Sequence, residues 1–378
     1  MQRHSLLLTA TAIALLTGIS FSCSKSGGGG STTNTGTTKD SVLLNIGNNI
    51  ILPAYQSLGA EVNSLDSAIT DFNAGPNSTK LASVQTLFKT AYTAWESVSA
   101  YNYFGPAYTA QPNLASINIF PTTTTLIDSN IRVNDDNVTA FANTAAKGFP
   151  ALDYLLFGAG NNTLVNYTTD ASAANRQKYL AAVSADIKAE VTAVVNGWSA
   201  SGRNYINTFV TGSGNSISSS LGLLINSMDQ DFENLKNYCL GVPLGLIPVG
   251  VTSPVLPKEV EAYYSGISAA LAQAQLKAIQ GIYLGTGGKA NGLGLITYLI
   301  NVKAQYNGGQ LSDTIKAAFA LDVTDLQAVP DPLSQTIQTN PAGAIAAFTE
   351  SQKLVALLKT DMPSSLGVLI TYGDNDGD

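Results

Sequence analysis

The chain has 378 residues, of which 45% are hydrophobic and only 12% charged, so it can bury a sizeable core beneath largely uncharged polar side chains. Its 19 basic and 26 acidic residues are spread without long runs. This balance excludes the concentrated basic surface that nucleic-acid binding requires, and we expect no nucleic-acid partner.

The N-terminus predicts export. Arg3 precedes an apolar run over residues 6–19, which is too short to span a bilayer and is typical of a signal peptide covering residues 1–22. Cys23 follows small Ser22 and precedes a Gly/Ser/Thr-rich tether over residues 23–39. This pattern resembles a bacterial lipoprotein processing site, whereas ordinary secretion with an incidental Cys23 is the alternative. We therefore expect a lipid-anchored protein of the cell envelope, on the periplasmic or outer-membrane face, with the membrane as a partner.

The body of the chain, from Asp40 onward, has helical periodicity. Apolar residues recur every three or four positions over residues 78–98, and Gly105–Pro106 ends that pattern. Similar stripes predict helices over 175–198, 216–241 and 256–285, with Pro257 in the first turn of the last. Further helices are expected near 311–321 and 341–362.

The predicted fold is all-α, with two packed helical-bundle domains and long connecting loops. The pattern breaks near residues 201–214, which predicts an N-terminal domain over 40–205 and a C-terminal domain over 206–378. Segments 105–137 and 241–257 are proline-punctuated and are expected to be the long loops.

Histidine is missing from the predicted mature chain, since the only one, His4, lies in the signal peptide. This excludes Ser-His-Asp and Cys-His catalysis and zinc sites built on histidine. Oxygen ligands remain, and they suit iron(III) and other hard cations such as calcium and magnesium. With Cys23 carrying lipid, Cys239 is expected to be an unpaired, buried thiol.

Six segments in order resemble the imelysin family: AYTAWESVSAYNYFGPA, KGFPALDYLLFG, DFENLKNYCLGVPLG, SPVLPKEVEAYYSGIS, GIYLG and LGVLITYGDNDGD. The resemblance covers the chain from about Asp40 to its end. It implies two helical bundles with a site where they meet. It also implies either a link to bacterial iron uptake, with iron-uptake components as partners, or the peptidase activity for which the family is named.

The family motif Gly-x-His-x-x-Glu falls on Gly148, Pro150 and Asp153. Positions i and i+3 of a helix share a face, so the histidine and glutamate of the motif could hold one metal ion. Pro150 has no donor atom, and Asp153 keeps only a shortened carboxylate. Two interpretations of Asp153 stay open: a first-turn residue favoured by the helix dipole, or a retained ligand contact, including a metal ligand.

Three further carboxyl or hydroxyl residues are candidates for the implied site. Glu96 is either a solvated helical residue or a pocket carboxylate, and neighbouring Trp95 is either core or a ligand platform. Glu261 and Ser265, four residues apart on the expected helix, would line the opposite wall of an interdomain cleft or form a solvated stripe. The acidic end, residues 374–378, is expected to be a tail rather than a calcium loop.

These observations favour a binding or accessory protein over an enzyme, because no complete catalytic set is present. The favoured hypothesis is an imelysin-like lipoprotein linked to iron uptake, with its site at the cleft. A peptidase that uses two carboxyl groups, such as Asp153 with Glu96, is one alternative. A module that binds a peptide or glycan is another.

Overall fold

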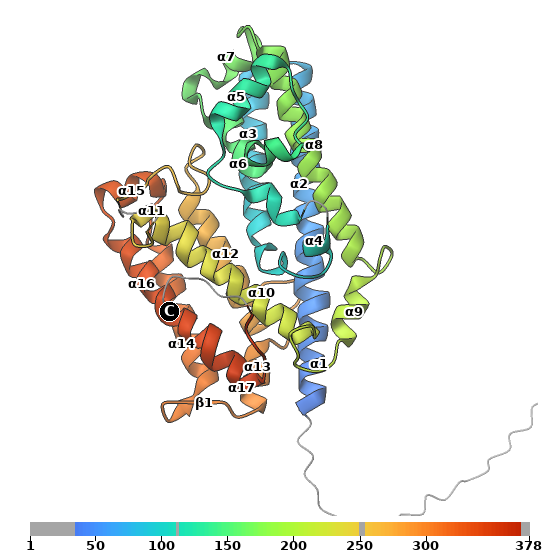
Figure 1. Ribbon diagram of the computed structural model, residues 1–378, viewed down its shortest axis with the longest axis vertical. Helices are drawn as coiled ribbons and strands as arrows, with labels where there is room; N and C mark the ends of the chain where they lie inside the picture. The colour runs from blue at the N-terminus through green and yellow to red at the C-terminus, as the bar shows by residue number, and fades with distance from the viewer. Residues whose placement is uncertain (1–34, 111–112, 249–253, 372–378) are drawn as a thin grey trace, which may run out of the picture. The chain divides into compact units, whose positions relative to one another are not determined.

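A computed structural model describes residues 35–110, 113–248 and 254–371. These residues are predominantly helical with almost no strand, which confirms the all-α prediction (Figure 1). The only strands in the described ranges are β1 (Gln305–Tyr306) and β2 (Gly309–Gln310), an antiparallel hairpin. The predicted signal peptide, the lipidation site at Cys23 and the 374–378 tail lie outside the described residues. The last residues of the predicted tether, 35–39, belong to the first helix instead.

The α-helices follow one another closely along the chain. Those before residue 215 are α1 (Thr35–Asn45), α2 (Leu52–Ala74), α3 (Ser78–Glu96), α4 (Gly105–Thr109), α5 (Thr124–Val133), α6 (Gly148–Phe157), α7 (Thr163–Thr168), α8 (Ala173–Trp198) and α9 (Tyr205–Thr211). Those after it are α10 (Ser220–Asn234), α11 (Val242–Leu244), α12 (Ser268–Leu284), α13 (Leu295–Asn301), α14 (Leu311–Gln327), α15 (Leu333–Thr339), α16 (Ala342–Ala356) and α17 (Met362–Leu366).

Shorter 3₁₀ and π segments complete the helical architecture. The 3₁₀ segments are η2 (Ser99–Tyr101), η3 (Leu114–Asn118), η4 (Phe141–Ala146) and η5 (Gly160–Asn162). The π segments are η1 (Ile46–Ile51), η6 (Leu235–Gly241) and η7 (Leu357–Asp361). Each π segment continues directly from an α-helix and leads into another, so it widens a long helix locally.

The first bundle forms because α2, α3 and α8 each carry an apolar stripe. The stripe of α3 that the sequence predicts is buried against α2 and against α6, and that of α8 is buried against α2. At the start of α3, the Asn77 side chain accepts a hydrogen bond from the Lys80 backbone N–H at 3.0 Å, which caps the helix. Figure 1 shows the long helices α2 and α8 running side by side.

The second group of helices contains α10, α12, α14 and α16. Helix α14 packs on both α12 and α16, and α10 packs on α12 and α16. Helix α12 also packs on α3, so it joins the two groups. This α3–α12 contact brings side chains from the two halves of the chain within reach of one another. The division at residue 205 stays a prediction.

Two segments differ from their expected structure. Part of the expected loop over 105–137 is folded into α4, η3 and α5. The expected helix opening at Pro257 is wrong, because α12 begins only at Ser268. Residues 257–267 are turns, in which Ala262 has φ +50° and Gly266 has φ +66°. Left-handed backbone at these positions is incompatible with a continuous α-helix.

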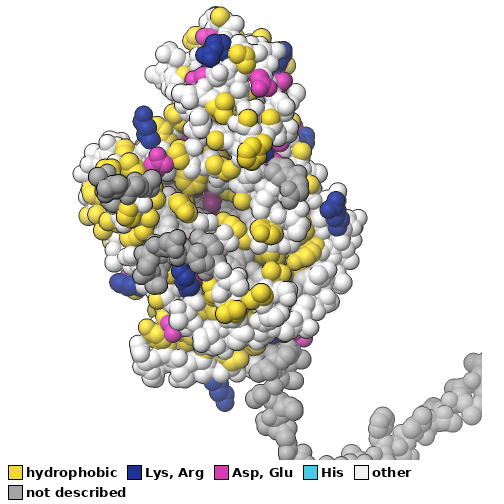
Figure 2. Space-filling model, viewed as in Figure 1, with side chains coloured by type: hydrophobic (Ala, Val, Ile, Leu, Met, Phe, Trp, Pro, Cys, Tyr) yellow, Lys and Arg dark blue, Asp and Glu magenta, His cyan; other side chains and the backbone are white. Residues whose placement is uncertain are grey.

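The outer surface has few charged side chains. Figure 2 shows scattered Lys, Arg, Asp and Glu side chains between large uncharged areas, as the composition predicts. Within the ranges that the structure describes, no helix has both the length and the apolar character needed to cross a membrane.

Candidate functional site

Gly148 begins α6, and it allows an unusually close approach of two backbones. Its φ is +76°, and a Cβ atom built there would lie 2.1 Å from the carbonyl oxygen of Ile117 in η3. Only glycine accommodates both the positive φ and this contact. Just before it, the buried Lys147 ammonium binds Asp186 at 2.9 Å and Glu190 at 2.7 Å on α8. The start of α6 is therefore fixed against both η3 and α8.

Asp153 lies in the second turn of α6 rather than in the first, and its carboxylate faces a different segment of the chain. Oδ2 accepts the backbone N–H of Tyr264 at 2.8 Å, and Oδ1 accepts that of Ser265 at 2.9 Å. Burial raises the pKa of Asp153 to about 6, although both hydrogen bonds act in the opposite direction. Asp153 therefore holds the 257–267 turns in place. Pro150, one turn earlier, is buried.

A cavity of about 330 Å³ lies beside these elements, and two of the predicted site residues line it. Glu96 comes from the end of α3, and Glu261 comes from the turns before α12. Both side chains are almost completely buried, which rules out the solvated interpretation of either. Trp95 is buried and also lines the cavity. Of the other predicted residues, Gly148, Pro150, Asp153 and Ser265 are not among its described lining residues.

Hydrogen bonds hold Glu261 through both its side chain and its backbone carbonyl. Asn118, at the end of η3, donates its side-chain N–H to Glu261 Oε1 at 2.8 Å. The Tyr92 hydroxyl in turn donates to Asn118 Oδ1 at 2.7 Å. Behind Glu261, the Ser268 hydroxyl donates to the Glu261 carbonyl. The residues of the family motif thus flank Glu261: Gly148 supports the segment that carries Asn118, and Asp153 supports the turn that follows Glu261.

A third carboxyl group, Asp231 of α10, completes the cluster. The Ser99 hydroxyl donates to its Oδ2 at 2.9 Å, and the Gln275 amide donates to its Oδ1 at 3.0 Å. In contrast, Glu96 Oε1 is buried without a hydrogen-bond partner. Among the described lining residues there is no lysine, arginine or histidine. The cavity therefore collects three buried acidic groups, with the half-buried Glu259 also at its edge, and no described basic side chain lines it.

The acidic cluster resists ionisation. Burial raises the pKa of Glu96 well above its ordinary value, and the negative charges of Glu261 and Asp231 raise it further. Burial raises the pKa of Asp231 to about 7. It also raises the pKa of Glu261, against the hydrogen bonds from Asn118 and its neighbours. Near neutral pH the cluster therefore retains protons that a positively charged ligand could replace.

Cys239 is buried and unpaired, as expected; it packs within the hydrophobic core and also borders this cavity. Its Sγ is 3.7 Å from both Glu261 Oε2 and Gln275 Oε1. Burial, followed by the charge of Glu261, raises the pKa of the thiol well above its ordinary value. The thiol is therefore protonated at neutral pH and is a poor nucleophile.

The fit of a metal ion can be tested on these side chains. In the described part of the chain, no three His, Cys, Asp or Glu residues are arranged to hold a metal ion. Both Asp153 oxygens already accept backbone N–H groups, so the position of the family glutamate does not offer a free ligand. A hard cation in the cavity would have to draw on neutral oxygens in addition to Glu96 and Glu261.

Sequence reasoning missed Asp231, Asn118, Cys239 and Gln275 as parts of the cavity. For Asp231 a signal was present, because it continues the apolar stripe of α10 at the spacing of Leu224, Met228 and Leu235. A carboxylate on a buried stripe indicates a polar site inside the core. Asn118 carried no such signal, since it lies in a segment expected to be a loop.

Comparisons with known proteins agree with this fold. A solved structure from Parabacteroides distasonis ATCC 8503, described as a putative iron-regulated protein A precursor, superposes with a TM-score of 0.69 at 16% identity, covering 89% of this chain and 96% of that one. An imelysin-like protein from Psychrobacter arcticum 273-4 gives 0.65 at 18% identity, covering 90% and 98%. These likenesses show the fold alone.

No curated protein sequence gives a significant match to this chain. The model of the peptidase M75 family, imelysin, matches residues 51–360, which is most of the chain. This range includes α6 and every residue named above in the acidic cavity. The chain therefore belongs to the imelysin family.

Proposed function

We propose that this chain is a binding or accessory protein of the bacterial cell envelope, linked to iron uptake, and that the acidic cavity is its ligand site. The observation that carries the proposal is the burial of Glu96, Glu261 and Asp231 around one cavity with no described basic side chain. Burying three carboxyl groups lowers stability unless a ligand or a proton compensates them. Such an arrangement favours binding of a cation.

The link to iron and the envelope has separate support. The cavity offers oxygen ligands, which iron(III) and other hard cations prefer. One similar fold belongs to a protein described as iron-regulated. The N-terminal sequence, with Cys23 after an apolar run, supports a lipid anchor at the membrane. Iron in this proposal is cargo, and other components of iron uptake would deliver or receive it.

Cation titration tests the proposal. The purified protein is titrated with calcium and magnesium by calorimetry at pH 7.0 and dialysed against ferric citrate. We expect one bound cation and proton release, because the cation replaces protons held by the cluster. Glu96→Gln and Glu261→Gln should each weaken binding by about tenfold or more, whereas Asp136→Asn, on the exposed surface, should not. Failure of all three cations to bind at millimolar concentration refutes the proposal.

An acid peptidase is the second candidate, and one feature favours it. Glu96 and Glu261 are buried at the same cavity, and the charge of Glu261 helps to raise the pKa of Glu96. Paired carboxyl groups that share a proton are the acid and base of aspartic proteases. Glu261 takes the place predicted for Asp153 in this pair. Cleavage of a denatured protein at pH 4–6, lost in Glu96→Gln, would establish the activity.

A further inference from the structure

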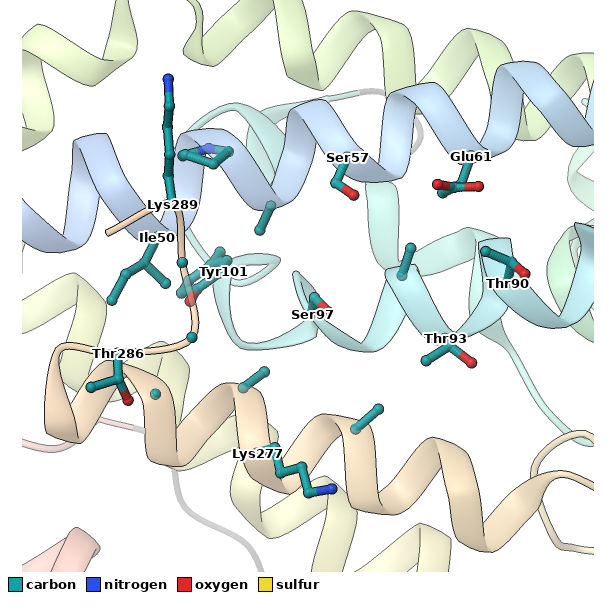
Figure 3. Close-up of a pocket in the computed structure, with 18 of the residues that line it drawn as sticks. Ile50, Ser57, Glu61, Thr90, Thr93, Ser97, Tyr101, Lys277, Thr286 and Lys289 are labelled. Carbon is teal, nitrogen blue, oxygen red and sulfur yellow. The ribbon is translucent and has the colours of Figure 1, made fainter. Parts of the chain in front are cut away.

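A second concave site lies on the other side of α3, outside the acidic cavity. It is a groove of about 840 Å³ between α2, α3, α12 and the glycine-rich turn at 286–289 (Figure 3). Ala54, Ala94, Ala278 and Gly281 line it, so the three helices leave space between them. None of the carboxyl groups in the acidic cavity borders this groove.

The groove is basic in an acidic protein. Lys89, Lys277 and Lys289 line it, and Glu61 is the single acidic residue among its described lining residues. None of the three lysines forms an ion pair with a described residue. The Lys89 ammonium lies 5.4 Å from the ring centre of Phe157, and its charge partly offsets the burial that raises the pKa of Asp153 and of Asp331. Lys277 and Lys289 have no described electrostatic partner, and lysines along one groove favour an anionic ligand.

The charges are distributed along the groove rather than gathered at one point. Figure 3 shows Glu61 and Thr90 at one end, Ile50 and Lys289 at the other, and Lys277 between them. Lys89, which directly precedes Thr90 in α3, also lines the groove. The groove runs from Ile50 in η1 to Glu61 in α2, which corresponds to roughly 16 Å at the rise of an α-helix. A single small anion could not span this length.

We propose that this groove binds an extended acidic peptide segment of a partner protein. About five residues in extended conformation match its length. The alanine-lined floor can pack against the aliphatic parts of a peptide. Tyr101 is the one aromatic residue among its described lining residues, and because its side chain is buried it offers no exposed ring on which a sugar could stack.

Hydroxyl groups add to this complementarity. The side chains of Ser57, Ser97 and Thr286 line the groove and make no hydrogen bond to any described residue. They are therefore available to the amide groups of a peptide backbone. The lysines would bind the carboxylates at separate points along the segment.

Fluorescence anisotropy tests this inference with a labelled Gly-Glu-Asp-Glu-Asp-Glu peptide in 50 mM salt. We expect binding that weakens with added salt, and at least ~10-fold loss in the Lys89→Gln, Lys277→Gln, Lys289→Gln triple variant. The matched control changes the same number of exposed lysines elsewhere: Lys258→Gln, Lys303→Gln and Lys316→Gln. It should retain the affinity of the wild type.

The remaining outcomes overturn the inference. These are no binding by the wild type at 1 mM, equal losses in both triple variants, or tighter binding of an equally charged polyuronate than of the peptide. Circular dichroism of both variants confirms folding. Because the peptide assay contains no added cation, failure here is separate from failure of the proposed cation site.

Discussion

Gly148→Ala perturbs the contact between α6 and η3 with a single methyl group. The new Cβ would lie 2.1 Å from the Ile117 carbonyl oxygen and 2.5 Å from its carbonyl carbon. These are backbone atoms, so no side-chain rotation can relieve the overlap. The η3 backbone would have to move by roughly 1 Å to reach an ordinary contact distance.

Two costs contribute to the expected effect. Alanine at φ +76° costs about 1–2 kcal/mol relative to a right-handed conformation. Overpacking against buried backbone costs a further 1–3 kcal/mol, approximately. We therefore expect the free energy of unfolding to fall by about 3 kcal/mol. Because Asn118 follows Ile117, the same shift should also lengthen its 2.8 Å hydrogen bond to Glu261.

Urea denaturation at pH 7 measures this loss. Gly343→Ala is the matched control, because Gly343 is the second residue of α16 and a methyl group added there would meet no atom within 4 Å apart from its chain neighbours and the backbone of its own helix. That variant should gain up to about 1 kcal/mol from improved helix propensity. If the free energy of unfolding of Gly148→Ala instead lies within about 0.5 kcal/mol of the wild-type value, the close approach at Gly148 does not constrain the fold.

Two further predictions concern carboxyl groups. Asp231→Asn tests the proton held by the buried Asp231 carboxyl group. The pKa of Asp231 in the folded protein, about 7, exceeds its value in the unfolded chain, so the native protein binds more protons than the unfolded chain between pH 4 and 7. The stability of the wild type therefore falls as pH rises through this range. Between pH 4 and 7 the free energy of unfolding of the wild type should fall by on the order of 3–4 kcal/mol because of this group, and Asp231→Asn should abolish that fall. If the free energy of unfolding of the variant depends on pH as steeply as that of the wild type, the assignment is contradicted. Asp153→Ala should speed hydrogen exchange of the Tyr264 and Ser265 amides by about tenfold, measured by NMR. The Ala269 and Ala270 amides, which bind Asp331, are the internal control, and equal acceleration of all four would indicate general unfolding instead.

Much of the helical architecture could be predicted from periodicity. The stripes of α3 and α8 are long, regular and buried as expected, because each helix faces the same neighbour over several turns. The helix expected from Pro257 failed for a physical reason. Carboxylates distant in sequence, Asp153 and Asp331, accept backbone N–H groups at Tyr264, Ser265 and the start of α12, and these contacts favour turns that local propensity does not reveal.

Two of the cavity's lining residues were among the candidate site residues singled out in the sequence, and whether they bind a ligand stays a prediction. Glu96 and Glu261 were identified as candidates, and the structure brings them to one cavity. The reasoning that paired Glu261 with Ser265 on one helix face was wrong, because neither residue lies in a helix. Asn118 and Gln275 could not be predicted, since their place in the cavity depends on how η3 and α12 pack rather than on their own neighbours in sequence.

The π segment η6 has a consequence for the length of helix that this cavity can accept. Asp231 and Cys239 both line it, although residues eight apart in a regular α-helix point about 80° away from each other. The wider π turn between them brings the two side chains closer to one direction. Deleting a single residue within 235–238 would restore α-geometry and leave Cys239 seven positions after Asp231, which is only about 20° from the same direction. The π turn therefore accommodates one additional residue in this helix while the same two side chains continue to face the cavity.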